Sequence, residues 1–105
     1  MQLATDASVS LGVVLTEWVT NAFKYAYPDD EPGEVRVRLK RLGNDKAELT
    51  VEDDGVGIAP NAPHAGTGLG SKIIQTMASA LQTHVEYINR RPGTAARLVL
   101  TTANA

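Results

Sequence analysis

Apolar residues recur at helical spacing in two parts of the chain, and each part predicts a helix. The first pattern runs from Asp6 to Tyr27, and Asp6 or Ser8 is a candidate for its N-cap. The second starts at Leu69 and continues to Leu81. The apolar face of the first helix comprises Leu11, Val14, Leu15, Trp18, Val19, Ala22 and Phe23. That of the second comprises Leu69, Ile73, Ile74, Met77 and Leu81.

Alternation of polar and apolar residues predicts four strands. They cover residues 34–41, 47–53, 84–89 and 95–101. In the first strand we expect Val35, Val37 and Leu39 to share the buried face. A short turn joins the first two strands, which predicts an antiparallel hairpin, and residues 90–93 join the last two strands. Four strands with one apolar face, and two helices to cover it, predict a two-layer α/β sandwich.

Composition narrows the class of protein. The 105 residues suit one domain, and a net charge of −2 argues against a general nucleic-acid binder. The absence of cysteine excludes disulfides, thiolate zinc sites and cysteine nucleophiles, and the two distant histidines do not favour a histidine metal site. The chain has neither a run of about 20 apolar residues nor a secretion signal, so we expect a cytoplasmic domain without membrane contact.

Asp53 continues the inward-facing series of residues 47, 49 and 51 on the second strand. A carboxylate on the core side of a strand is costly unless donors meet it. Two interpretations stay open: it accepts backbone amides of the following turn, or it accepts a ligand donor such as an amine. Gly55 and Gly57 follow at once, and residues without a β-carbon allow a planar ligand to approach the backbone.

Gly66, Gly68 and Gly70 lead into the second helix. Backbone N–H groups at a helix start, with the positive end of its dipole, can bind an anion, and Lys72 in the first turn would add charge. A flexible connector with an ordinary N-cap is the other interpretation. The spacing is neither that of a Walker A loop nor that of a dinucleotide-binding fold.

Glu17, Asn21 and Lys24 share one face of the first helix because they lie at positions i, i+4 and i+7. A solvated stripe is the ordinary interpretation of such a set. An acid, an amide oxygen and a cation on one stripe can also hold hydrated Mg²⁺ and a phosphate chain.

These motifs, in this order, resemble those of the GHKL ATPase superfamily. Residues 17–25 (EWVTNAFKY) are similar to its N box, residues 53–58 (DDGVGI) to its G1 box, and residues 66–70 (GTGLG) to its G2 box. Within the superfamily the chain most resembles the catalytic ATP-binding domain of a bacterial sensor histidine kinase, in the HWE-like branch. The resemblance spans about residues 6–100 and implies the Bergerat fold, a mixed, mostly antiparallel sheet with helices on one face.

The resemblance also implies ATP and Mg²⁺ as cofactors. Asp53 would accept the adenine amino hydrogen, supported by Thr94, with Gly55 and Gly57 beside the base. Asn21 would be the metal ligand that coordinates Mg²⁺ between the phosphates.

Further residues would surround the phosphates by the same resemblance. Lys24 would approach a phosphate and Tyr25 would lie near the nucleotide. Gly66, Gly68 and Gly70, with Leu69, would hold the phosphates beneath a lid formed by residues 59–66. Glu17 is the candidate catalytic residue, which either activates water or orients a Mg²⁺-bound water.

The implied activity is transfer of the ATP γ-phosphate to a histidine on a separate dimerisation domain, upstream of a response regulator. Neither His64 nor His84 has the helical setting of a phosphoacceptor, so we expect residues 1–105 to be a monomeric catalytic domain. We expect it to be excised from a longer chain, and a natural short protein that acts on a separate partner is the other interpretation. An anti-sigma-type serine kinase and a degenerate pseudokinase or phosphotransfer scaffold are the alternatives. Intact Asp53 and Asn21 count against the scaffold.

Overall fold

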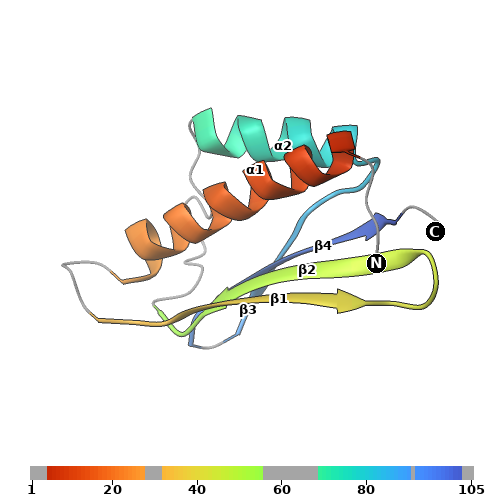
Figure 1. Ribbon diagram of the computed structural model, residues 1–105. Helices are drawn as coiled ribbons and strands as arrows, with labels where there is room; N and C mark the ends of the chain where they lie inside the picture. The colour runs from red at the N-terminus through yellow and green to blue at the C-terminus, as the bar shows by residue number, and fades with distance from the viewer. Residues whose placement is uncertain (1–4, 28–31, 56–68, 91, 103–105) are drawn as a thin grey trace.

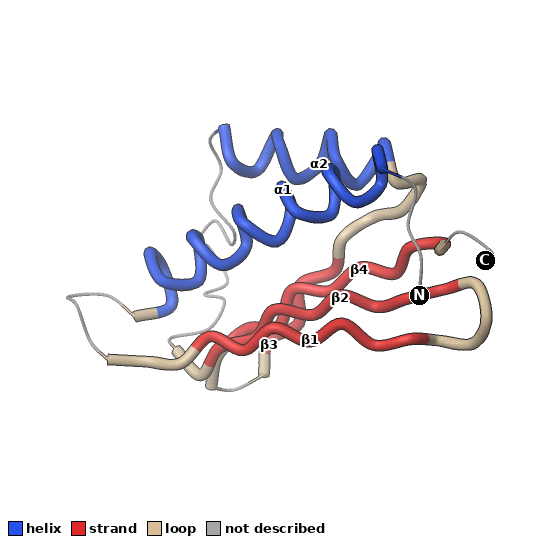
Figure 2. The backbone as a smooth tube through the Cα atoms, viewed as in Figure 1, coloured by secondary structure: helices blue, strands red, loops and turns tan. Residues whose placement is uncertain are grey.

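The computed structural model describes residues 5–27, 32–55, 69–90 and 92–102, and the elements appear in the predicted order (Figures 1 and 2). Two helices, α1 and α2, lie on one side of a four-stranded sheet, so the described part is a two-layer α/β sandwich. The elements are α1 (Thr5–Asn21), the π-helix η1 (Ala22–Ala26), β1 (Val35–Arg41), β2 (Lys46–Asp53), α2 (Leu69–Ala80), β3 (Glu86–Asn89) and β4 (Thr94–Thr101).

The strand order in the sheet is β1-β2-β4-β3. The predicted hairpin of β1 and β2 forms, and all three pairings between the described strands are antiparallel. The pairing of β2 with β4 joins the two hairpins into one sheet, and it places Glu52 opposite Ala95 near one end. That pairing brings the end of β2 next to the start of β4, although 41 positions separate Asp53 from Thr94.

The core lies between the helices and the two central strands. Val14 and Trp18 of α1 and Ile74 of α2 are buried against Leu49 of β2 and Leu98 of β4. The period of 3.6 residues in the helices and of two in the strands brings these apolar side chains to one interface. Burial of their apolar surface is the main favourable contribution to this fold.

Two apolar residues of β1 are not buried as predicted. Val37 is 50% exposed and Leu39 is 48% exposed, although their partners in the register, Val51 and Leu49, are buried. The reason is the position of β1 at the edge of the sheet, since α1 packs against the neighbouring strand β2. Alternation in the sequence identified the face of β1 but not how far the helices extend over it.

The first helix also differs from the prediction at both ends. Its α-helical part begins at Thr5, with Asp6 in the first turn, so Ser8 lies inside the helix and is not its cap. At the other end the chain changes from α-helix to π-helix after Asn21. The wider π turn alters the side-chain direction, and Phe23, which the helical period placed on the apolar face, is exposed.

Candidate functional site

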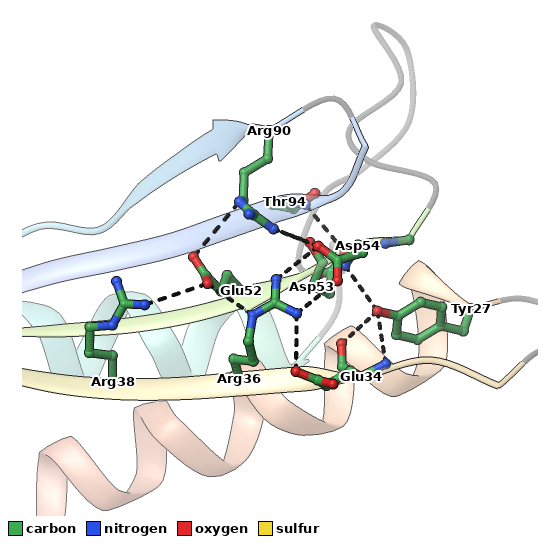
Figure 3. Close-up of polar contacts among 10 residues, drawn as sticks. Tyr27, Glu34, Arg36, Arg38, Glu52, Asp53, Asp54, Arg90 and Thr94 are labelled. Carbon is green, nitrogen blue, oxygen red and sulfur yellow. Dashed lines mark hydrogen bonds and ion pairs between the residues drawn. The ribbon is translucent and has the colours of Figure 1, made fainter.

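Asp53 is a buried carboxylate at the end of β2, with only 5% of its surface exposed (Figure 3). Its Oδ1 accepts hydrogen bonds from the backbone N–H groups of Gly55 at 2.9 Å and of Thr94 at 3.2 Å. The inward position is therefore confirmed. The interpretation that backbone amides satisfy this carboxylate is confirmed for Oδ1.

The second oxygen of Asp53, Oδ2, accepts no hydrogen bond from the part of the chain that the structure describes. No fully buried side-chain oxygen or nitrogen among these described residues lacks a partner, so Oδ2 has solvent-accessible surface. Asp53 therefore combines an anchored oxygen with an oxygen that can accept a donor from outside the chain. An exocyclic amine would satisfy this acceptor.

Gly93 allows the turn between β3 and β4 to cross close to Asp53. A β-carbon at Gly93 would lie 1.9 Å from the backbone oxygen of Asp53, and the φ of Gly93 is +94°, a conformation that L residues rarely adopt. Its neighbour Thr94 is then placed to donate to the Asp53 carboxylate. The sequence showed Gly93 as a turn glycine, but no sequence pattern indicated that it contacts Asp53.

Asp54 is held by two arginines that the sequence analysis did not select. Arg36 of β1 makes a bidentate contact to its carboxylate, with Nη1 to Oδ2 at 2.7 Å and Nη2 to Oδ1 at 2.8 Å. Nη1 of Arg90 donates to the same Oδ1 at 2.8 Å and also to the backbone oxygen of Asp53 at 2.9 Å (Figure 3). The hydrogen bonds from Arg36, and then those from Arg90, hold the pKa of the Asp54 carboxyl well below its usual range.

Glu52 and Glu34 extend this ion network. Glu52 accepts from Nε of Arg36 at 3.0 Å, and Nε of Arg90 lies 3.7 Å from its other oxygen. Glu34 accepts from Nη1 of Arg36 at 3.2 Å. The hydrogen bond from Arg36 lowers the pKa of Glu52 despite its partial burial. Since Arg36 and Glu52 are partners in the β1–β2 register, they lie side by side on the same face of the sheet.

Tyr27 connects the end of the first helical segment to the end of β2. Its hydroxyl oxygen accepts from the backbone N–H groups of Asp54 at 2.9 Å and Glu34 at 3.1 Å, and its O–H donates to the backbone oxygen of Glu34. Gly33 leaves room for the ring, because a β-carbon there would lie 2.1 Å from Tyr27 Cε1. The resemblance to the N box indicated Tyr25, but no sequence pattern indicated Tyr27, whose role depends on contacts across the fold.

The predicted site residues of the first helical segment lie at one end of the molecule. Glu17 and Asn21 are half-buried on α1, and Lys24 is exposed on η1, which also contains Tyr25. The C-terminal end of α1, the start of α2 and the end of β2 face this same end (Figure 1).

The glycine-rich segment is described only where it enters α2. Leu69 and Gly70 are the first two residues of that helix. Gly57, Gly66 and Gly68, and the predicted lid of residues 59–66, lie outside the described residues.

The side chains of Glu17 and Asn21 suit a magnesium ion. Both offer hard oxygen donors, and Mg²⁺ is usually held by one or two such protein ligands together with waters and substrate phosphates. The described ranges contain no cluster of three or more His, Asp or Glu side chains that could cage a metal ion by themselves. This donor set fits a metal that arrives with a phosphate ligand.

Comparison with known proteins identifies the family. The sequence model of the histidine kinase-, DNA gyrase B-, and HSP90-like ATPase family matches residues 6–104. The chain belongs to this ATPase family. The two-layer fold agrees with that assignment, whereas the narrower HWE-like branch stays a prediction.

The similar proteins are bacterial histidine kinases. Blue-light-activated histidine kinase 2 of Erythrobacter litoralis is 29% identical over 95 residues, which cover 90% of this chain and 28% of the relative. Sensor histidine kinase AruS of Pseudomonas aeruginosa is 36% identical over 89 residues, which cover 65% of this chain and 8% of that protein. The histidine kinase domain of the Erythrobacter litoralis EL346 kinase superposes with a TM-score of 0.81 at 26% identity, covering 94% of this chain and 52% of that structure.

The chain thus spans less than a third of the length of these curated relatives. Their names support a histidine kinase catalytic role for the domain. Neither α1 nor α2, the α-helices of the described ranges, is long and apolar enough to cross a membrane.

Proposed function

We propose that this domain binds Mg-ATP and transfers the γ-phosphate to a histidine on a separate helical dimerisation and phosphoacceptor domain. The phosphate would then pass from that histidine to a response regulator. The observation that carries the proposal is the buried carboxylate of Asp53: backbone amides anchor one oxygen, and the other accepts no hydrogen bond from the residues that the structure describes. The ATPase family and the histidine kinase relatives support the same activity.

Adenine recognition rests on Asp53. Oδ2 would accept a hydrogen of the exocyclic amino group, while the backbone amides of Gly55 and Thr94 hold Oδ1 and fix the plane of the carboxylate. A hydrogen bond to a charged acceptor contributes about 1.5–3 kcal/mol, which corresponds to a factor of about ten to a hundred in affinity. Gly57 would leave space for the base close to the backbone.

Phosphate binding would use the two helix ends at the same end of the molecule. Asn21 would coordinate Mg²⁺ and Glu17 would orient a water on it, while Lys24 would approach a phosphate and Tyr25 would lie near the nucleotide. The phosphates would also meet the backbone N–H groups of Gly66, Gly68, Leu69 and Gly70, where the positive end of the α2 dipole favours an anion. Bound Mg²⁺ would neutralise charge on the phosphates during the transfer.

The acceptor would lie on another domain, because a phosphoacceptor must approach the γ-phosphate from outside the nucleotide site. His84 lies between α2 and β3, outside the described helices, and His64 is outside the described residues. The domain would therefore supply the nucleotide and its positioning, and the partner domain would supply the nucleophile. Phosphoryl transfer depends mainly on such positioning and on charge stabilisation.

Calorimetric titration with a non-hydrolysable ATP analogue, with and without Mg²⁺, tests the proposal. We expect Mg²⁺-enhanced binding by the wild type, no measurable binding by Asp53→Asn, and loss of only the Mg²⁺-dependent part of the affinity in Asn21→Ala. Asp45→Asn is the matched control, since this aspartate is exposed in the β1–β2 turn. Wild-type affinity in Asp53→Asn would refute the adenine assignment, and an unchanged Mg²⁺ effect in Asn21→Ala would refute the metal assignment.

The phosphorylated residue distinguishes the kinase classes. A reconstituted reaction with the phosphoacceptor domain of a histidine kinase should give a phosphate that acid removes, since phosphohistidine is acid-labile. Acid-stable phosphate on a serine of the partner protein would instead support the anti-sigma-type serine kinase.

A further inference from the structure

Arg36, Asp54 and Arg90, here called the arginine clamp, join three parts of the fold at the end of β2. Arg36 belongs to β1, Asp54 directly follows β2, and Arg90 lies in the turn between β3 and β4. The backbone N–H of Arg90 also donates to the backbone oxygen of Gly93 at 3.0 Å, which fixes the turn that carries it. The end of β2 is thus held from the strands on both of its sides (Figure 3).

The clamp acts on the backbone of Asp53 and not on its carboxylate. Arg90 donates from one nitrogen to the backbone oxygen of Asp53 and to the side chain of Asp54, so it spans both residues. The backbone N–H of Asp54 is held by the Tyr27 hydroxyl. With the peptide between Asp53 and Asp54 fixed by both its oxygen and its N–H, the direction of the Asp53 side chain is fixed as well.

The clamp and the carboxylate lie on opposite faces of the sheet. Arg36 and its partner Glu52 occupy alternate positions to the inward series of Leu49 and Val51, and therefore the face away from the helices. The Asp53 carboxylate follows the inward series. A ligand bound at Asp53 would therefore not touch the guanidinium groups, so their hydrogen bonds can affect its binding only through the backbone, whereas their charge acts alike on ligands of equal charge.

We propose that Arg36 and Arg90 are positioning residues for base recognition, which keep Oδ2 of Asp53 aimed at the amino group of the adenine ring. This role rests on the proposed function, because it assumes that Asp53 receives that amino group. The β2–β4 ladder pairs the strands only up to Glu52, so the clamp holds the backbone of Asp53 and Asp54 beyond that ladder.

Arg97 offers a matched control on the same sheet. It lies in β4 and bonds two carboxylates, Glu48 and Glu86, in an ion network like that of Arg90. Its side chain is 30% exposed, against 33% for Arg90. Removing Arg97 therefore deletes comparable ion pairs without touching Asp53 or Asp54.

The decisive experiment compares the affinities for ATP and for purine riboside triphosphate, which lacks only the exocyclic amino group. We expect the wild type to prefer ATP, and Arg90→Ala to reduce this preference about fivefold, the factor for one hydrogen bond of ordinary net strength. Arg97→Ala should keep the wild-type preference. Arg90→Lys keeps the charge and one donor, and its preference should lie between those of the wild type and Arg90→Ala.

A readout without nucleotide separates positioning from general stability. The amide resonances of Gly55 and Thr94, which bond to Asp53 Oδ1, should shift in Arg90→Ala and stay in place in Arg97→Ala. Unshifted resonances, or a wild-type ATP preference in Arg90→Ala, would refute the positioning role while leaving the proposed function intact. Equal wild-type affinity for the two triphosphates would refute the adenine assignment, and with it both proposals.

Discussion

The substitution Gly93→Ala should destabilise the fold more than Gly43→Ala, the same change at the glycine in the turn between β1 and β2. The new β-carbon would lie 1.9 Å from the backbone oxygen of Asp53 and 2.7 Å from its carbonyl carbon. Backbone atoms cannot rotate away as a side chain can. The turn must therefore shift by about 1 Å or more, since β-carbons essentially never come within 3.0 Å of such atoms.

The magnitude follows from two contributions. A positive φ costs an L residue about 1–2 kcal/mol. The shift of the turn also weakens the bonds from Thr94 to the Asp53 carboxylate and from Arg90 to the Gly93 carbonyl, each with a net value of about 0.5–1.5 kcal/mol. We therefore expect a loss of about 2–5 kcal/mol, a large fraction of the 5–15 kcal/mol typical of a domain.

Gly43→Ala is the control for backbone strain alone. Gly43 also has a positive φ, +80°, but a β-carbon there meets no atom within 4 Å. Only the conformational cost of the positive φ, about 1–2 kcal/mol, therefore applies to Gly43→Ala. Urea unfolding followed by the fluorescence of Trp18, the only tryptophan in the sequence, measures both variants. Equal losses of unfolding free energy in Gly93→Ala and Gly43→Ala would refute the close approach of Gly93 to Asp53.

Two further predictions concern the core and the ion network. Ile74→Ala should cost about 2–5 kcal/mol in the same urea assay, because the residue is 1% exposed and its loss leaves a cavity between the layers. A loss below about 1 kcal/mol would contradict this packing, since each buried carbon group that is deleted contributes about 0.8 kcal/mol even without a cavity. The pKa values of Glu52 and Asp54 are lowered in the folded chain, so their ionised forms stabilise it above the unfolded pKa of about 4, and this contribution is lost as the pH falls further. Arg36→Ala should therefore make unfolding free energy less dependent on pH in the acid range, and a profile parallel to the wild type would show that these ion pairs do not contribute.

Local patterns predicted most of the elements. The alternation through residues 47–53 predicted a strand with Asp53 on its inner side, and Asp53 is buried there. The spacing of Ile74 along the second helix likewise predicted a buried position. Both predictions needed only the regular period of the backbone and the cost of exposing apolar side chains.

Other features could not be predicted because they depend on neighbours that are distant in sequence. Val37 and Leu39 have the pattern of buried residues, but they lie on an edge strand beyond the main helix cover. The change from α- to π-helix after Asn21 likewise has no simple signature in the composition of the segment.

The sequence by itself determined the order of the elements, the inward side of Asp53 and the resemblance that predicted the ATPase family. Only the tertiary structure decided what surrounds Asp53, because its contacts come from a strand pairing that no local pattern specifies. The antiparallel pairing of β2 with β4 brings Thr94 to its carboxylate and Arg90 to its backbone. The sequence defines the chemistry of each side chain, but its hydrogen-bond partners depend on how segments that are distant in sequence pack against one another.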